Sequence, residues 1–188
     1  LQIIKDVAQV CEKHGICYMA DGGTALGSVR HKGFIPWDDD VDILMPRADY
    51  EKLAACVEKE LSHKYWVQSL ASGEKYDLNF LKLRKKGTLF VEIYDNEPEN
   101  AGICIDVFPL DDTYDNPVAS KLYGVVSEGL FLMASCVRMH QKKERLLQYT
   151  ESPSLARSIR LKCAIGRLLN SRRNPQLWYR RCERWSKK

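Results

Sequence analysis

The stretch Trp37-Asp38-Asp39-Asp40-Val41-Asp42-Ile43-Leu44 decides how the rest of this chain is interpreted. It places four carboxylates within five positions and ends on apolar residues. Like charges so close repel one another, so a folded protein keeps them together when something neutralises them. A strand over about residues 39–44 would turn Asp40 and Asp42 to one face and Val41 and Ile43 to the other. Two carboxylates backed by an apolar face suit Mg²⁺ or Mn²⁺; the alternative is a solvated acidic loop.

The segment before the acidic stretch predicts a helix, a short strand and a glycine-rich turn. Residues 2–14 carry an apolar stripe at helical spacing that Gly15 ends. Residues 16–20 form a short apolar run, which predicts a buried strand. Gly22-Gly23-Thr24 then leads into a second helix. A strand, a glycine-rich turn and a helix start in this order present backbone N–H groups to an anion.

The remaining pattern predicts an α+β fold. After a helix over residues 47–60, strands are expected at 65–68, 80–84, 88–94 and 103–108, with Pro109 ending the last one. Helical periodicity without strand signals covers 118–149, 154–170 and 175–187. We therefore expect a mixed sheet flanked by helices over residues 1–117, followed by a helical C-terminal region over residues 118–188.

A third carboxylate stands out in the predicted strand at 103–108. Asp106 lies between Ile105 and Val107, where burial of an unpartnered ion would be costly. A metal ion shared with Asp40 and Asp42 would remove this cost. The alternative is a hydrogen-bonded aspartate at the end of a strand.

The order of these motifs resembles the nucleotidyltransferase fold of the DNA polymerase β type. Residues 18–53, YMADGGTALGSVRHKGFIPWDDDVDILMPRADYEKL, go further and closely resemble the LicD family. Its members include bacterial phosphocholine transferases, and fukutin and fukutin-related protein are relatives. Residues 81–88 and 102–111 also look like blocks of this family. The resemblance covers about residues 1–117; we find no counterpart of the family's C-terminal aromatic and Tyr-Gly-Asp region, so we expect a chain that is C-terminally truncated or whose last third has been replaced or has diverged.

The resemblance implies a metal-dependent transferase acting on a CDP-activated alcohol. The reaction most typical of the family moves phosphocholine from CDP-choline to a hydroxyl of a cell-surface glycan, such as lipopolysaccharide or teichoic acid, and releases CMP. The alternatives are transfer of a polyol phosphate of the ribitol type, or a nucleotide-binding homologue without turnover. The resemblance also implies that Asp40, Asp42 and Asp106 are the catalytic residues and hold Mg²⁺ or Mn²⁺. Asp106 is the candidate base for the acceptor hydroxyl.

Further residues are candidates for contacts with the donor phosphates. The resemblance assigns Gly23 and Thr24 to this role. Lys82 and Arg84 lie two apart in a predicted strand and therefore share a face. They would meet the pyrophosphate or form a solvated strand face.

The residues around the acidic stretch have two interpretations each. Arg30 is a phosphate clamp or a salt-bridge partner of Asp38 or Asp39. His31 is a proton shuttle or packs within its loop. Trp37 stacks on a base, closes the pocket or packs beside the preceding proline. Asp38 and Asp39 orient the metal ligands or bind a second metal ion.

Charge and composition bear on location and partners. The net charge of +4 divides into 13 basic and 21 acidic residues over 1–120, or −8, and 16 basic and 4 acidic residues over 121–188, or +12. The basic part suits phosphates, a lipid surface or a glycan acceptor linked to lipid, and we do not expect a nucleic-acid partner. The alternative is that these basic residues form solvated helix faces without a ligand. Seven scattered cysteines without a C-x-x-C pair favour a cytoplasmic protein, and no long apolar window predicts a membrane span. The basic and aromatic residues of the last helices suggest peripheral membrane contact or packing against a partner: Arg172, Arg173, Trp178, Tyr179, Arg180, Arg181 and Trp185.

Overall fold

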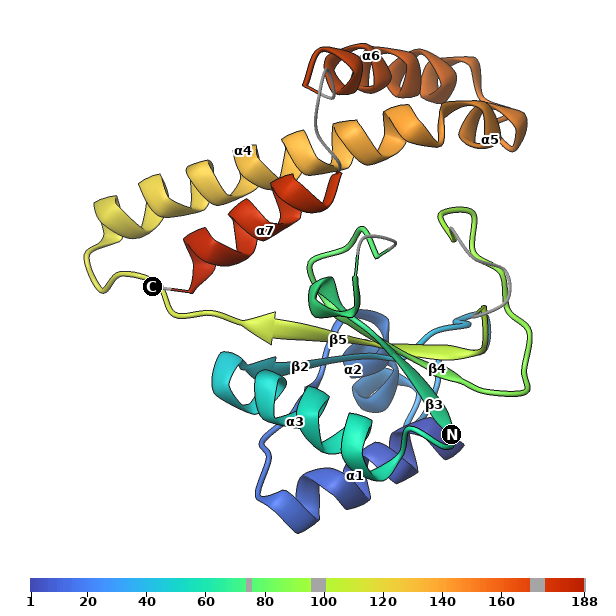
Figure 1. Ribbon diagram of the computed structural model, residues 1–188, viewed down its shortest axis with the longest axis vertical. Helices are drawn as coiled ribbons and strands as arrows, with labels where there is room; N and C mark the ends of the chain where they lie inside the picture. Colours follow the sequence, from blue (N-terminus) through green and yellow to red (C-terminus); the bar gives the residue numbers. More distant parts are fainter. Residues whose placement is uncertain (74–75, 96–100, 170–174, 188) are drawn as a thin grey trace. The chain divides into compact units, whose positions relative to one another are not determined.

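The computed structural model describes residues 1–73, 76–95, 101–169 and 175–187. These residues form two compact units (Figure 1). The first comprises Leu1–Gly73 and Phe80–Asp111, and the second comprises Glu74–Asn79 and Asp112–Lys188. The first unit therefore ends six residues before the boundary expected at 117, and a short segment before β4 belongs with the C-terminal helices.

The first unit is built on a five-stranded mixed sheet with the strand order β1-β2-β5-β4-β3. The strands are β1 (Met19–Ala20), β2 (Asp42–Pro46), β3 (Tyr65–Gln68), β4 (Leu81–Lys85) and β5 (Cys104–Leu110). Strands β2 and β5 pair in parallel, whereas the pairs β1–β2, β3–β4 and β4–β5 are antiparallel. A 3₁₀ turn, η1 (Leu70–Ser72), follows β3. The mixed sheet with its helices confirms the expected α+β class.

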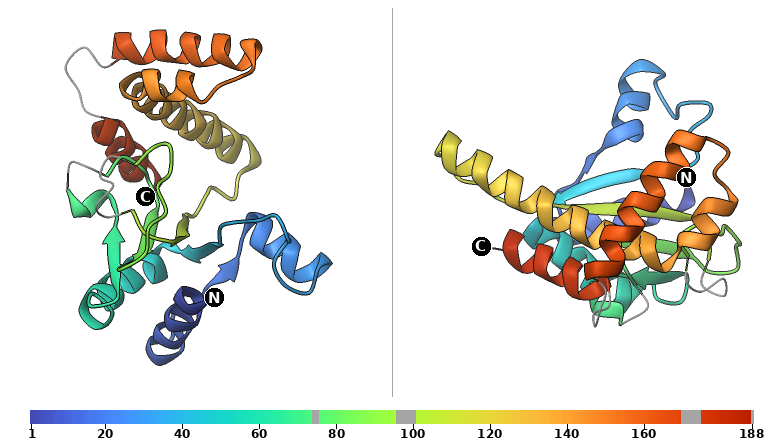
Figure 2. Two further views of the ribbon diagram at one scale, coloured as in Figure 1. Left: turned by 90° about the vertical axis from the view of Figure 1, so that its right-hand side faces the viewer. Right: turned by 90° about the horizontal axis from the view of Figure 1, so that it is seen from above.

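Helices α1 (Gln2–His14) and α3 (Arg47–Glu60) lie side by side on one face of the sheet (Figures 1 and 2). Their apolar stripes and the inward residues of the strands, such as Ile43 and Val107, form one hydrophobic core. Gly15 ends α1 in the left-handed conformation, with φ of 60°. Within this core, the buried carboxylate of Asp6 accepts hydrogen bonds of 2.7 Å from Tyr65 Oη and from Gln2 Nε2.

Several strands differ from the sequence-based expectation. The run at 16–20 yields only the two exposed residues of β1, because this strand lies at the edge of the sheet. Strand β2 begins at Asp42 rather than near 39. No strand forms over residues 88–94. Pro109 lies within β5 instead of ending it; pairing with β4 stops at Val107, so the missing N–H of proline is tolerated there.

The second unit consists of helices α4 (Pro117–Gln141), α5 (Lys143–Gln148), α6 (Pro153–Leu169) and α7 (Pro175–Ser186). The side chain of Asn116 caps α4 by accepting hydrogen bonds from two backbone N–H groups. Helices α6 and α7 pack on different sides of α4 (Figures 1 and 2). In α7 the ring of Tyr179 contacts Phe131, and Trp185 stacks on Tyr123.

The aromatic residues of α7 therefore mainly serve packing. Trp178 and Tyr179 are buried, which makes the expected membrane-facing surface of α7 wrong for these two side chains. Arg172 and Arg173, which belonged to the same expected surface, lie outside the described residues.

Helix α4 is long and apolar enough to cross a membrane by length and composition, in contrast to the expectation from the sequence. It is the one such helix among the described residues. This criterion alone is weak evidence, because core helices of soluble proteins also meet it. Helix α4 packs against α6 and α7, but only 17% of its most apolar window is buried.

Candidate active site

A row of charged side chains crosses the sheet on the face opposite to α1 and α3. Asp42 on β2 is the register partner of Asp106 on β5, which is also the register partner of Lys82 on β4. The next residue in each strand, Ile43 after Asp42 and Val107 after Asp106, belongs to the hydrophobic core. Because side chains alternate along a strand, the charged row lies on the other face. The sheet thus joins residues that are up to 64 positions apart in the chain.

The two paired aspartates are crowded by negative charge. Burial, followed by the carboxylates of Asp40 and Asp106, raises the pKa of Asp42 to about 6. Burial also raises the pKa of Asp106, although the Lys82 ammonium opposes this effect. A positive ion beside these carboxylates would relieve the repulsion between them.

The acidic stretch approaches this pair from the N-terminal side of β2. One carboxylate oxygen from each of Asp38, Asp39 and Asp40 lies within 4.8 Å of the other two. Burial, followed by the charge of Asp38, raises the pKa of Asp40. The carbonyl of Val41 accepts a 3.0 Å hydrogen bond from the backbone of Asp106, so pairing begins one residue before β2. Val41 is buried between Asp40 and Asp42, so the alternation expected from the sequence persists although β2 begins later.

The glycine-rich turn is the start of helix α2 (Gly22–Arg30), and it lies against the carboxylates. A Cβ added to Gly23 would lie 2.5 Å from Asp38 Oδ2, so any larger residue would require the Asp38 side chain to move. The hydroxyl of Thr24 accepts a 3.0 Å hydrogen bond from the backbone N–H of Asp42. This bond fixes the first turn of α2 to the start of β2. The helix N-terminus and the acidic cluster are therefore neighbours, as the motif order predicted.

Lys82 adopts neither of the two roles expected from the sequence. Its side chain is buried, and its Nζ atom lies 2.8 Å from Asp106 Oδ1 and 2.9 Å from Glu92 Oε2. Burial by itself lowers the pKa of Lys82, but the negative charge of Asp106 outweighs it and the pKa lies above its usual value. Lys82 is therefore an internal counterion of Asp106 rather than a solvated lysine.

Arg84 likewise serves the protein itself. It is 1% exposed, and its guanidinium donates hydrogen bonds to five acceptors. They are Gln68 Oε1 at 2.9 Å, the carbonyls of Phe90 at 3.3 Å and Gly102 at 3.1 Å, Glu92 Oε2 at 2.5 Å and Asp95 Oδ1 at 2.6 Å. Arg84 thereby anchors the segment that follows β4 over the sheet. Because Arg84 is buried and surrounded by these acceptors, it does not fit the predicted role of a phosphate-binding residue.

Arg30, His31 and Trp37 form an exposed group near the acidic stretch. Arg30 Nε lies 3.4 Å from His31 Nδ1, and the rings of His31 and Trp37 meet edge to face at 6.0 Å between centroids. Among the described residues no ion pair joins Arg30 to Asp38 or Asp39. Trp37 is 76% exposed, so it does not pack in the protein interior. Its indole face and the Arg30 guanidinium remain open to a ligand.

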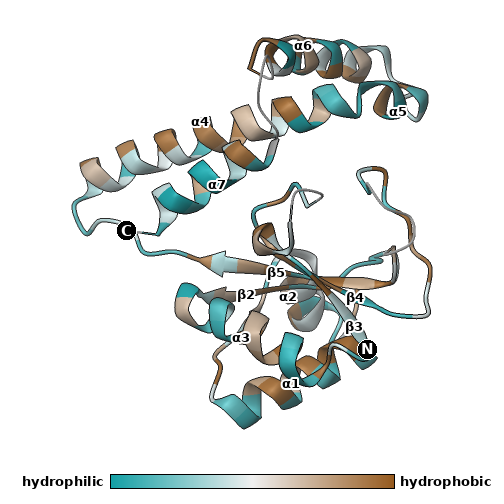
Figure 3. Ribbon diagram, viewed as in Figure 1, coloured by the Kyte–Doolittle hydropathy of each residue, from teal (hydrophilic) through white to brown (hydrophobic). Residues whose placement is uncertain are grey.

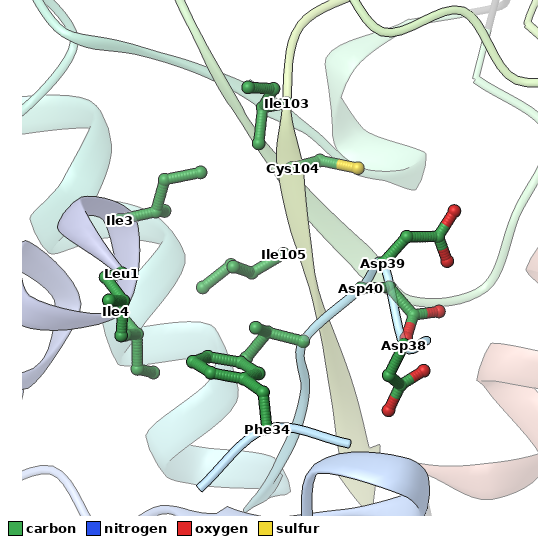
Figure 4. Close-up of a pocket in the computed structure, with 11 residues that line it drawn as sticks. Leu1, Ile3, Ile4, Phe34, Asp38, Asp39, Asp40, Ile103, Cys104 and Ile105 are labelled. Atoms are coloured by element: carbon green, nitrogen blue, oxygen red, sulfur yellow. The ribbon is translucent and has the colours of Figure 1, made fainter. Parts of the chain in front are cut away.

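A cavity of about 150 Å³ lies beside the acidic stretch. Figure 4 shows the carboxylates of Asp38, Asp39 and Asp40 on one side of it and apolar side chains on the other. The apolar part is lined by Leu1, Ile3, Ile4, Phe34, Val41, Ile103 and Ile105, with Cys104 beside them. The cavity thus borders the acidic stretch from the side of α1 and Ile105, and Asp42, Asp106, Gly23 and Thr24 are not among the residues that line it.

The carboxylates fit a hard divalent cation. Carboxylate oxygens are the ligands that Mg²⁺ and Mn²⁺ prefer. Both carboxylate oxygens of Asp106 face the ammonium of Lys82, with Nζ 2.8 Å from Oδ1 and 3.1 Å from Oδ2. A cation at this carboxylate would share it with Lys82, and the paired Asp42 and the neighbouring Asp40 could complete its ligand set.

Sequence reasoning anticipated the acidic side of this site better than its basic side. The ion pair of Lys82 with Asp106 and the participation of Glu92 were not foreseen. A signal was present, because Lys82 and Asp106 each stand alone between apolar neighbours in a strand. Single buried charges require partners, and opposite ones in neighbouring strands are the simplest solution.

The structure defines an α+β protein in which paired carboxylates lie on one face of a mixed sheet, beside a helix that begins with glycine. The particular family emerges from comparison with known proteins. A family model described as "LicD/FKTN/FKRP, nucleotidyltransferase domain" matches residues 15–120. The chain belongs to this family, which confirms the resemblance seen in its motifs.

Characterised and uncharacterised relatives share part of the chain. It is 39% identical over 69 residues to the lipopolysaccharide cholinephosphotransferase LicD of Haemophilus influenzae, covering 37% of this chain and 26% of that protein. Uncharacterized proteins of Rickettsia prowazekii and Rickettsia typhi are each 50% identical over 42 residues, which cover 22% of this chain and 16% and 14% of theirs. The chain thus matches about a quarter or less of the length of these relatives.

Proposed function

We propose that this chain holds the catalytic core of a metal-dependent transferase with a nucleotidyltransferase fold. The reaction would move phosphocholine from CDP-choline to a hydroxyl group of a cell-surface glycan and release CMP. Membership of the LicD family and the name of the Haemophilus relative support the chemical class. The observation that carries the proposal is the register pairing of Asp42 with Asp106 beside the start of α2.

The donor phosphates would bind at the start of α2. Backbone N–H groups at a helix N-terminus and the positive end of the helix dipole favour phosphate there. Gly23 would let the backbone approach the phosphates closely. The Thr24 oxygen accepts a hydrogen bond from the backbone N–H of Asp42, so the hydroxyl proton would point away from that bond and donate to a phosphate oxygen. The exposed Arg30 would add a charged fork, and Trp37 would offer a stacking surface for the cytosine.

The aspartates would prepare the acceptor and the phosphate for transfer. Asp40, Asp42 and Asp106 would hold Mg²⁺ or Mn²⁺, which when bound supplies positive charge for the phosphate oxygens. Asp106 would accept the proton of the acceptor hydroxyl. Lys82 would hold Asp106 in place through its ion pair with this carboxylate. Asp38 and Asp39 would orient the ligand set or contribute to a second metal ion.

The donor alcohol, the acceptor and the cellular location follow from the same proposal. The carboxylates of Asp38, Asp39 and Asp40 suit the cationic head of choline, whereas a polyol phosphate such as ribitol phosphate is the competing donor. The acceptor would be a glycan or a lipid-linked glycan. The seven cysteines are unpaired, which supports a cytoplasmic location.

The deciding experiment measures CMP release from a panel of CDP-alcohols that includes CDP-choline and CDP-ribitol. The protein is incubated with Mg²⁺ or Mn²⁺ and a glycan acceptor, with EDTA as a blank. Asp42→Asn and Asp106→Asn should each lower the rate by at least about a hundredfold, since they remove proposed ligands. Asp112→Asn is the matched control, because this aspartate is exposed and outside the charged row. Release that persists in EDTA or in both site variants would contradict the proposal.

A further inference from the structure

Helix α6 carries apolar side chains on two opposite faces. On one face, Ile159, Cys163 and Gly166 are buried, and α4 lies so close that a Cβ on Gly166 would be 2.0 Å from a backbone oxygen of α4. The second set is Leu161, Ile165 and Leu168, which are 66%, 41% and 78% exposed. At about 100° per residue, the second set points away from α4 and forms one outward stripe. Figure 3 shows such hydrophobic residues among the hydrophilic ones of α6.

Three arginines border this outward stripe. Arg157, Arg160 and Arg167 are all exposed. Within the described part of the chain, their side chains form no hydrogen bond or ion pair. By helical geometry they lie along one side of the stripe. Helix α6 contains no aspartate or glutamate, so nothing on it neutralises these charges.

We propose that α6 docks in the surface of an anionic lipid bilayer through this outward face. Apolar residues bordered by arginines are the pattern of a helix that lies in the plane of a membrane interface. The apolar side chains would enter the acyl boundary, while the arginines would reach the lipid phosphates. A nucleic acid would account for the arginines alone, and an apolar protein groove would account for the stripe alone.

This surface differs from the one that the sequence suggested. Sequence reasoning placed membrane contact on the basic and aromatic residues toward the C-terminus, yet Trp178 and Tyr179 are buried. Helix α6 instead leaves its outward stripe uncovered. The proposal concerns where the protein binds and is independent of the transfer reaction.

The first test measures cosedimentation of the whole chain with lipid vesicles. One set contains phosphatidylcholine alone, and the other is an equal mixture of phosphatidylcholine and phosphatidylglycerol. We expect binding to the mixed vesicles that weakens as salt is added. Each arginine near an anionic surface contributes about fivefold, so Arg157→Gln/Arg160→Gln/Arg167→Gln should weaken partitioning on the order of a hundredfold. No binding of the unmodified chain, or equal binding to both vesicle types, would overturn the proposal.

The second test separates the apolar stripe from charge alone. Leu161→Ser/Ile165→Ser/Leu168→Ser should weaken binding to the mixed vesicles by at least about tenfold, since these side chains would leave the acyl boundary. Leu89→Ser/Val91→Ser is the matched control, because these residues are 75% and 43% exposed, lie outside α4 and α6, and lack flanking arginines. The control should stay within about twofold of the unmodified chain. Circular dichroism verifies that each variant is folded.

Two results of the second test would reject α6 as a membrane surface. One is unchanged vesicle binding of the serine variant, which would leave only charge. In that case, an RNA oligonucleotide that displaces the vesicles would identify a nucleic-acid surface instead. The other is an equal loss of binding in the Leu89→Ser/Val91→Ser control, which would show that exposed apolar area anywhere on the protein suffices.

Discussion

Replacing Lys82 by methionine tests whether the charged row is an internal ion network. The side chain of Lys82 is 4% exposed, and its Nζ lies 2.8 Å from Asp106 and 2.9 Å from Glu92. Glu92 keeps Arg84 as a partner at 2.5 Å, so the loss falls on Asp106. Removing one member of a buried ion pair costs about 3–5 kcal/mol, because the remaining charge stays buried without a counterion. We therefore expect Lys82→Met to destabilise the sheet by about 3 kcal/mol.

Hydrogen exchange of the backbone amides in β4 and β5 measures this effect where it arises. A loss of about 3 kcal/mol corresponds to roughly a hundredfold fall in protection, since about 1.4 kcal/mol is a factor of ten. Lys13→Met is the matched control. Lys13 pairs with Glu60 at 2.8 Å, but its side chain is 62% exposed, so protection should hardly change.

The double variant Lys82→Met/Asp106→Asn sharpens the test. With the orphaned carboxylate neutralised, it should be more protected than the sum of the two single variants predicts, by about 0.5–3 kcal/mol. Protection in Lys82→Met within about threefold of the unmodified chain would refute the reasoning. So would additive single effects, because they would mean that the two side chains do not stabilise each other.

Three other predictions concern different parts of the molecule. Burial alone would raise the pKa of Asp6, but its hydrogen bonds outweigh this effect and the pKa is lowered. The ionised carboxylate therefore stabilises the fold above about pH 4, and this contribution is lost as the pH falls through the folded-state pKa. Asp6→Asn should flatten the acid side of the Tm–pH curve. Gly23→Ala should displace Asp38 and weaken Mn²⁺ binding severalfold in a calorimetric titration, while stability is unchanged or rises by up to about 1 kcal/mol; unaltered binding would contradict the close approach. Gly166→Ala should lower stability by roughly 1–3 kcal/mol, because the new Cβ meets the backbone of α4. Gly129→Ala has open space around the new Cβ and should raise stability by about 0.5–1 kcal/mol. Thermal melts in which the two variants shift Tm in the same direction would contradict this packing.

The acidic half of the site could be predicted because its signals are local. Asp40 and Asp42 flank a single apolar residue, and Gly22-Gly23-Thr24 stands between a strand and a helix. Such patterns depend on neighbours in the chain, so they survive although β1 is short and β2 begins at Asp42. The helices at the C-terminus were predictable for the same reason, since their periodicity extends over many residues.

The basic half could not be predicted because it depends on pairing across the sheet. The register that sets Lys82 opposite Asp106 is a long-range property, and a shift of one residue would place Lys82 on the other face. The segment at 88–94 has strand composition but folds over Arg84, where it supplies Glu92 as a counterion. Tertiary pairing of charges overrides strand propensity in that segment.

The position of β5 has a consequence for how the protein is made. Among the described residues, β5 is the last strand in sequence, yet it lies in the middle of the sheet between β2 and β4. Until Leu110 has left the ribosome, β2 and β4 each present an open edge that can pair with another chain. The nascent protein is therefore most prone to aggregate just before Asp42 and Asp106 meet across the sheet. Slow translation or a chaperone at that stage would protect the fold, and a chain ending before Cys104 would lack both the central strand and the site.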